Sequence, residues 1–139
     1  MNNQDGRCLC GKVKFSVKNR GNKVTACHCG MCRRWGGGPL IEVECGAQVT
    51  FNGEGSISVY DSSEWAQRGF CKHCGSHLFY RIKDTQEYQV PVGLFENQQN
   101  LIFKEQVFID EKPDYYSFSN KTSDLTGAEI YAMYAGSQE

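Results

Sequence analysis

The stretch Cys71-Lys72-His73-Cys74-Gly75 decides how this 139-residue chain folds. Two thiolates separated by two residues can point at one metal ion from a tight turn, and the glycine after the second thiolate suits a backbone with positive φ. Zinc in a structural site takes four ligands in a tetrahedron, so this segment supplies half of one site. The other half has to come from elsewhere in the chain.

Two further cysteine clusters lie upstream of this segment. Cys8-Leu9-Cys10-Gly11 is a pair with one spacer, which in an extended strand points both sulfurs to the same side. Cys27-His28-Cys29-Gly30-Met31-Cys32 adds three sulfurs. Two pairs far apart in sequence with a third cluster between them indicate zinc. Seven sulfurs divide into four and three, so filling one site leaves the other with an open position, and open zinc can bind and activate a small molecule.

The spacing leaves several arrangements open. Cys8 and Cys10 can share a metal with Cys71 and Cys74, or with two cysteines of the middle cluster. A histidine or a carboxylate could close the three-sulfur site, and both metals would then be structural. A disulfide framework is the less favoured reading, because the polar start of the chain lacks the features of a secretory leader. A thioredoxin-type motif is disfavoured because Cys71–Cys74 precedes a strand-like run rather than a helix.

The composition narrows the class of protein. A length of 139 residues predicts a single domain, residues 1–139. The formal net charge of −1 shows no basic bias, so we expect no nucleic-acid partner. No run is long and apolar enough to predict a membrane span. Retained thiolates predict a reducing compartment, the cytoplasm. The eighth cysteine, Cys45, ends an alternating run and is predicted to be a buried free thiol.

Apolar residues alternate with polar ones over short segments, which predicts a mainly β fold with antiparallel pairing. Asn52–Gly55 reads as a hairpin turn, and Pro91 indicates an edge strand or a bulge. Arg33–Pro39, with three consecutive glycines, reads as a loop. Thr126 and Glu129 form a capping-box pattern that predicts a short C-terminal helix. The predicted strands are 12–18, 24–26, 40–45, 48–51, 57–60, 68–70, 77–82, 88–94 and 107–109.

Three segments together resemble a known family. C-x-C-G-x-V-x-F at Cys8–Phe15, C-H-C-x-x-C-R-R at Cys27–Arg34 and F-C-x-x-C-G-S-x-L-F at Phe70–Phe79 are similar to the glutathione-dependent formaldehyde-activating enzyme and centromere protein V family. The resemblance implies a β-tent of two or three small antiparallel sheets stapled by zinc. It implies two Zn²⁺ per chain: a structural ion on Cys8, Cys10, Cys71 and Cys74, and a catalytic ion on Cys27, Cys29 and Cys32.

The family also implies an activity. Its named reaction condenses glutathione with formaldehyde to S-(hydroxymethyl)glutathione and is classed as a carbon–sulfur lyase, so a small thiol and an aldehyde are the expected partners. Arg33 or Arg34 could hold a carboxylate of the substrate, Trp35 could wall the pocket and His28 could contribute to it. No catalytic residue is predicted beyond the zinc site. The alternative is a zinc-stapled binding module without catalysis, in which both metals would be closed.

Overall fold

The computed structural model describes residues 3–137, which fall into two compact units. The first unit holds the residues up to Asn22 together with Glu42–Leu101, and the second holds Lys23–Ile41 together with the residues from Ile102 on. The first unit contains the two cysteine pairs, and the second contains the group of three, Cys27, Cys29 and Cys32. The prediction that the chain behaves as one domain stays a prediction.

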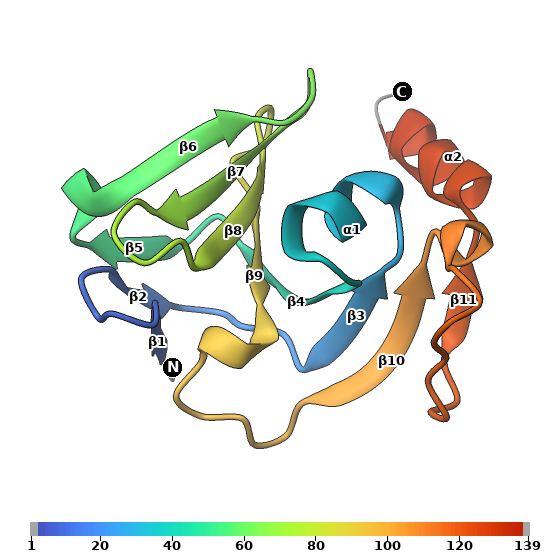
Figure 1. Cartoon of the computed structure of the whole chain (residues 1–139), viewed down its shortest axis with the longest axis horizontal. Coiled ribbons are helices and arrows are strands. Elements are labelled where there is room, and N and C mark those ends of the chain that lie inside the picture. Colours follow the sequence, from blue (N-terminus) through green and yellow to red (C-terminus); the bar gives the residue numbers. More distant parts are fainter. Residues whose placement is uncertain (1–2, 138–139) are drawn as a thin grey trace. The chain divides into compact units, whose positions relative to one another are not determined.

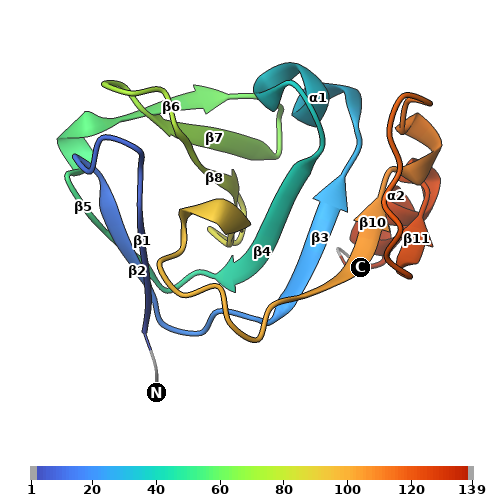
Figure 2. The same cartoon turned by 60° about the horizontal axis from the view of Figure 1, so that its bottom comes forward.

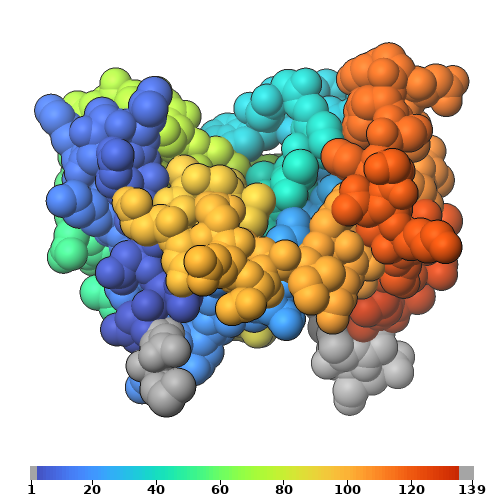
Figure 3. All heavy atoms as spheres, turned by 90° about the horizontal axis from the view of Figure 1, so that it is seen from below, coloured from blue at the N-terminus to red at the C-terminus, as the bar shows by residue number. Residues whose placement is uncertain are grey.

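In the first unit, three strands form an antiparallel sheet: β1 (Gln4–Arg7), β2 (Lys14–Val17) and β5 (Val49–Asn52). Phe15 and Val17 of β2 are buried, as the alternation predicts. The sequence analysis missed β1, because its four residues carry no apolar side chain. What holds β1 is a distant segment: Gly6 bridges to Phe95, and the Glu96 N–H donates to the Asp5 carbonyl. Figure 3 shows this segment, in yellow, packed against the blue N-terminal strands.

The other strands of the first unit pair antiparallel in the order β4 (Leu40–Gly46, in this unit from Glu42), β9 (Tyr88–Pro91), β8 (His77–Ile82), β7 (Ala66–Cys71) and β6 (Ile57–Asp61) (Figure 1). The predicted hairpin at Asn52–Gly55 is wrong. β5 pairs with β2 and β6 pairs with β7, so the 3-10 turn Glu54–Ser56 joins strands of different sheets. Pro91 does not mark an edge strand either, because it is the last residue of a strand paired on both sides.

The core of the first unit forms around two of the predicted metal ligands. Cys8 and Cys71 are buried together with Val13, Leu78 and Phe79. Phe51, Ile57, Cys74, Tyr88 and Leu94 pack against this cluster. One cysteine of each pair, Cys8 and Cys71, is therefore part of the hydrophobic core of this unit.

Three strands of the second unit pair in parallel. β3 (Lys23–Cys27) and β11 (Ser123–Leu125) lie on either side of β10 (Ile102–Val107), as Figure 2 shows. A mainly β fold is confirmed, but the expectation of antiparallel pairing throughout is wrong here. Parallel neighbours need a long connection, and β3 and β10 are joined through the whole of the intervening chain. The predicted last strand, 107–109, is displaced to 102–107.

Two helices complete the second unit: α1 (Gly30–Gly36) and α2 (Gly127–Ser137). The predicted capping box opens α2. The Glu129 N–H donates to the Thr126 hydroxyl at 3.2 Å, and the Thr126 N–H donates to the Glu129 carboxylate at 3.0 Å. None of the helices within residues 3–137 is both long and apolar enough to span a bilayer.

Candidate metal centres

The sulfur atoms of Cys8, Cys10, Cys71 and Cys74 all lie within 4.8 Å of one another. The Cys8 and Cys10 sulfurs are 3.6 Å apart, and those of Cys10 and Cys71 are 3.7 Å apart. Four sulfurs placed about 2.3 Å from a zinc ion in a tetrahedron are separated by about 3.8 Å. This cluster, termed the four-cysteine cluster below, therefore has the spacing that a tetrahedral zinc ion requires.

Two hairpin turns of the first unit hold these sulfurs. Cys8 and Cys10 lie in the turn between β1 and β2 rather than in the extended strand we expected. Cys71 ends β7, and Cys74 lies in the turn that leads to β8. Gly75 has φ of 81° and donates its N–H to the Cys71 carbonyl at 2.7 Å, which confirms the predicted positive-φ turn.

The surroundings of these thiols shift their pKa values in opposite directions. A hydrogen bond with the Ser76 hydroxyl, 3.2 Å from the Cys74 sulfur, is the main cause that lowers the pKa of Cys74 to about 5. The Lys12 N–H lowers the pKa of Cys10, but burial and the neighbouring thiols outweigh it and raise that pKa to about 11. With its pKa raised in this way, the Cys10 thiol stays protonated at neutral pH. A divalent ion among the four sulfurs would favour the ionised form of Cys10.

The second cluster, termed the three-cysteine cluster, consists of Cys27, Cys29 and Cys32, whose sulfurs also lie within 4.8 Å of one another. Among residues 3–137, no histidine, carboxylate or further cysteine joins this group. Cys27 and Cys32 are buried, and Cys29 is half-buried. Hydrogen bonds with the other two sulfurs, followed by burial, raise the pKa of Cys27. A cation at this cluster would favour the ionised form of Cys27.

The end of β3 and the start of α1 bring these three sulfurs together. Cys27 pairs with Val107 at the end of β10, and the His28 N–H continues the pairing by donating to the Val107 carbonyl at 3.1 Å. Cys29 is extended and caps the helix, since its sulfur accepts the Cys32 N–H at 3.4 Å. A strand followed directly by a thiol-capped helix therefore folds the C-x-C-x-x-C spacing into one site.

The sequence analysis missed α1 and predicted a loop over Arg33–Pro39. The helix has seven residues and no apolar periodicity, and cysteine is not among the usual N-cap residues. The available signal was the glycine run. Gly37 ends the helix with φ of 85° and donates its N–H to the Arg33 carbonyl at 2.7 Å.

His28, between Cys27 and Cys29 in the sequence, is fully buried. Its Nε2 is 2.8 Å from the Gln106 amide oxygen, and its Nδ1 is 2.7 Å from the Tyr116 hydroxyl. The Gln106 amide nitrogen donates to Thr122 at 2.9 Å, so its oxygen faces His28 and can only accept. The proton of the ring therefore sits on Nε2, and Nδ1 accepts from Tyr116. Burial lowers the pKa of His28, which favours this neutral form.

The other residues predicted near the metal occupy α1. The Arg33 Nε–H donates to the His28 carbonyl at 3.0 Å, which ties the helix to the loop that carries the cluster. Arg34 is exposed and Trp35 is half-buried. Both arginines lie in the last turn of the helix. They are therefore close to the three-cysteine cluster along the chain.

The remaining histidines and the eighth cysteine lie elsewhere. His73 bonds to the Ser56 hydroxyl at 3.0 Å, and His77 Nε2 is 3.0 Å from the Phe79 carbonyl. Cys45 is 1% exposed and donates to the Val43 carbonyl, as expected for a buried free thiol. All eight cysteines are free, so the disulfide reading is not supported.

Comparison with known proteins identifies the family of this chain. A relative from Schizosaccharomyces pombe (strain 972 / ATCC 24843), described as an uncharacterized lyase, is 35% identical over 127 residues, which are 91% of this chain and 93% of the relative. A crystal structure of a Rhodobacter sphaeroides protein matches with a TM-score of 0.58 and 27% identity, over 67% of this chain and 88% of that one. The family model for the glutathione-dependent formaldehyde-activating enzyme matches residues 3–111, a range that contains all seven clustered cysteines. This chain therefore belongs to the glutathione-dependent formaldehyde-activating enzyme family.

Proposed function

We propose that this protein is a lyase-type enzyme that joins a small thiol to an aldehyde at the three-cysteine cluster, with Zn²⁺ as the metal. The observation that carries the proposal is the unequal number of ligands. Within the described residues, one cluster offers four sulfurs and the other offers three. Four sulfurs close a tetrahedral ion, whereas three leave one position for a substrate. We assign the four-cysteine cluster to a structural zinc ion.

The reaction of this family type is an addition. A thiol sulfur bonds to the carbonyl carbon, the π bond of the carbonyl opens, and the thiol proton ends on the oxygen. Glutathione and formaldehyde would give S-(hydroxymethyl)glutathione in this way. Zinc held by three thiolates, with a local charge of about −1, favours a soft fourth ligand such as a thiol and would lower the pKa of that thiol.

Side chains on and near α1 would bind and orient the thiol substrate. Arg33 and Arg34 place two cations on the helix that carries Cys32, which suits the carboxylates of a glutathione-like substrate. Arg33 retains its two terminal NH₂ groups after donating Nε–H to His28. Trp35 would supply apolar surface next to them. For His28 we propose a positioning role, since both of its ring nitrogens bond to protein groups.

The proposed reaction also runs without a catalyst, so the test compares its rate with and without the protein. Metal-loaded protein is mixed with glutathione and ¹³C-formaldehyde, and the exchange between free and adduct carbon is followed by NMR. We expect exchange faster than in a matched solution without protein. Cys29→Ser should remove this excess, and Cys45→Ser, which alters a thiol outside both clusters, should keep it.

The same assay tests the arginines through the dependence of the rate on glutathione concentration. Arg33→Met should raise the glutathione concentration needed for half-maximal rate more than it lowers the maximal rate. An exchange rate no faster than in the solution without protein, measured with both metals bound, would contradict the enzymatic proposal. It would favour the non-catalytic binding module.

Clusters of free thiolates persist in reducing compartments, so we also propose the cytoplasm as the location.

A further inference from the structure

The first unit contains a cavity of about 380 Å³ between β5 and the strands β6, β8 and β9. Six of its nine lining residues have apolar or aromatic side chains, among them Phe51, Phe79 and Tyr88, and polar atoms supply the larger part of the exposed wall. Its volume lies at the lower end of the range of ligand pockets, about 300–1,000 Å³. The space therefore suits a small molecule that combines an apolar body with a polar group.

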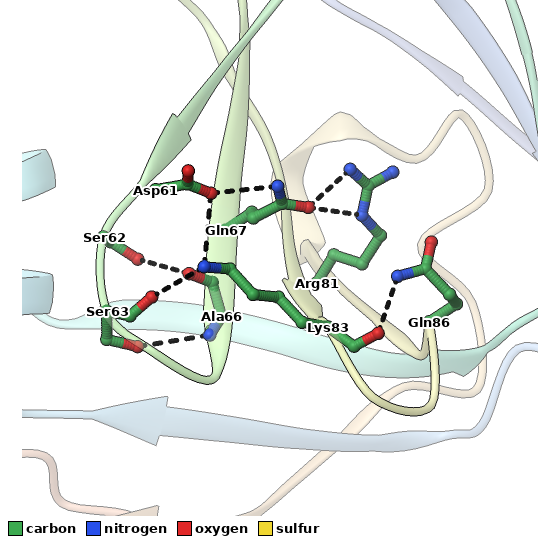
Figure 4. Close-up of polar contacts among 8 residues, drawn as sticks. All are labelled: Asp61, Ser62, Ser63, Ala66, Gln67, Arg81, Lys83 and Gln86. Carbon is green, nitrogen blue, oxygen red and sulfur yellow. Dashed lines mark hydrogen bonds and ion pairs between the residues drawn. The ribbon is translucent and has the colours of Figure 1, made fainter.

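One cation in the wall, Arg81, is held in a fixed orientation (Figure 4). Its Nε and Nη2 donate to the Gln67 amide oxygen at 3.2 and 2.7 Å, and its Nη1 donates to the Tyr88 hydroxyl at 3.1 Å. The guanidinium also lies over the Phe79 and Tyr88 rings, 5.1 and 5.6 Å from their centroids. The Asp61 carboxylate orients Gln67 in turn by accepting its amide N–H at 2.9 Å.

These bonds leave part of the guanidinium available. A guanidinium carries five N–H groups, and the bonds to Gln67 and Tyr88 use three of them. Two N–H groups remain, which is the number that a carboxylate accepts from an arginine. Because Gln67 and the aromatic rings already hold Arg81, a ligand would not have to order this side chain on binding.

We propose that this cavity binds a small monocarboxylate with an apolar body, with the carboxylate on Arg81 and the body against Phe51 and its apolar neighbours. A monoanion fits better than a phosphate because Arg81 is the one cation in the wall and the exposed Glu54 adds a negative charge there. All the lining residues belong to the first unit, whereas the three-cysteine cluster belongs to the second. The proposal therefore does not rest on the proposed enzymatic function.

The test is an NMR titration of the full, metal-loaded ¹⁵N-labelled chain with hexanoate and benzoate. The uncharged amides hexanamide and benzamide serve as matched ligands. We expect both acids to shift resonances of residues 49–59 and 79–88. A hydrogen-bonded charge contributes about 1.5–3 kcal/mol, so each acid should bind roughly ten- to a hundredfold more tightly than its amide.

Three variants test separately the positive charge of Arg81, the two-pronged geometry of its guanidinium and the volume of the cavity. Arg81→Met should abolish the preference for the acid, and Arg81→Lys should retain only part of it, because the ammonium group lacks the two-pronged geometry. Val49→Phe should fill the cavity and abolish the binding of both acid and amide. Lys83→Met is the control: this nearby cation bonds to Ser63 and Asp61 and does not line the cavity, so the preference should persist.

Four results would overturn the proposal. These are equal affinity for acid and amide, an acid preference that survives Arg81→Met, shifts confined to other residues, and no shifts at concentrations on the order of tens of millimolar, where the weakest specific ligands bind.

Discussion

Replacing Cys71 and Cys29 with serine should have opposite consequences for folding, although both residues are clustered cysteines. Cys71 is fully buried and lies in the core of the first unit with Leu78 and Phe79. A structural zinc ion contributes about 10–16 kcal/mol to folding in small zinc domains, whereas a whole domain has about 5–15 kcal/mol of stability. Loss of the ion at the four-cysteine cluster therefore removes an amount comparable to the entire stability. Cys71→Ser should be unfolded.

Cys29→Ser should lose one metal ion and remain folded. Cys29 is half-buried and caps α1 by accepting the Cys32 N–H. Serine is among the best N-cap residues, so the substitution keeps an acceptor at the start of the helix. The pairing of β3 with β10 and of β10 with β11 does not involve this sulfur. We expect the free energy of unfolding to fall by no more than about 3 kcal/mol, within the range of ordinary substitutions.

Native mass spectrometry counts the metals, and far-UV circular dichroism with urea titration measures the fold. The wild type should carry two ions, and Cys29→Ser one ion with a native spectrum. Cys45→Ser provides the matched control for a buried thiol outside both clusters, and it should keep two ions. If Cys29→Ser unfolds as completely as Cys71→Ser, or if Cys71→Ser stays folded, the division into a structural and a working site is wrong.

Three smaller perturbations test other contacts. Burial lowers the pKa of His77 to about 4, below the usual 6.5, so the unfolded chain binds a proton that the native chain rejects between these values. Through His77 the free energy of unfolding should therefore fall by about 1 kcal/mol from pH 7 to 5.5, and urea titration should show a fall smaller by about that amount in His77→Gln. Tyr116→Phe leaves His28 Nδ1 without its hydrogen-bond donor and should weaken metal binding at the three-cysteine cluster by about tenfold. Competition with a chromophoric chelator measures this affinity, and an unchanged affinity would contradict the positioning role of His28. Thr126→Ala removes the cap of α2 and should speed amide exchange of Ile130 by about fivefold, corresponding to ~1 kcal/mol; unchanged exchange would show that the cap adds nothing.

The sequence predicted features that depend on neighbouring residues. The alternation over Lys12–Lys18 predicted which side chains of β2 are buried, because successive residues of a strand face opposite sides. The capping box placed the start of α2 to within a few residues, because its two bonds join residues three apart. The turn at Gly75 followed from its place after a C-x-x-C pair. In each case the interacting groups lie within a few positions of one another.

The failures also have a common cause. β1 has no apolar side chain and is held by Phe95 and Glu96, about ninety positions away. α1 lacks periodicity and depends on a thiol cap at Cys29. The parallel pairing of β3 with β10 involves segments whose local patterns do not encode strand direction. Packing and long-range hydrogen bonds decide these features, and the local spacing of residues does not predict such distant contacts.

The sequence by itself determined that seven cysteines fall into three short-spaced clusters that could hold metal ions, since short spacings keep the sulfurs of each cluster close together. It did not determine by spacing which clusters share an ion. Only the tertiary structure brings Cys10 to 3.7 Å from Cys71 across 61 positions, and only there do Tyr116 and Gln106 close around His28. The reason is physical: hairpins β1–β2 and β7–β8 meet because they bury a common core, and this burial depends on the whole first unit rather than on any one segment.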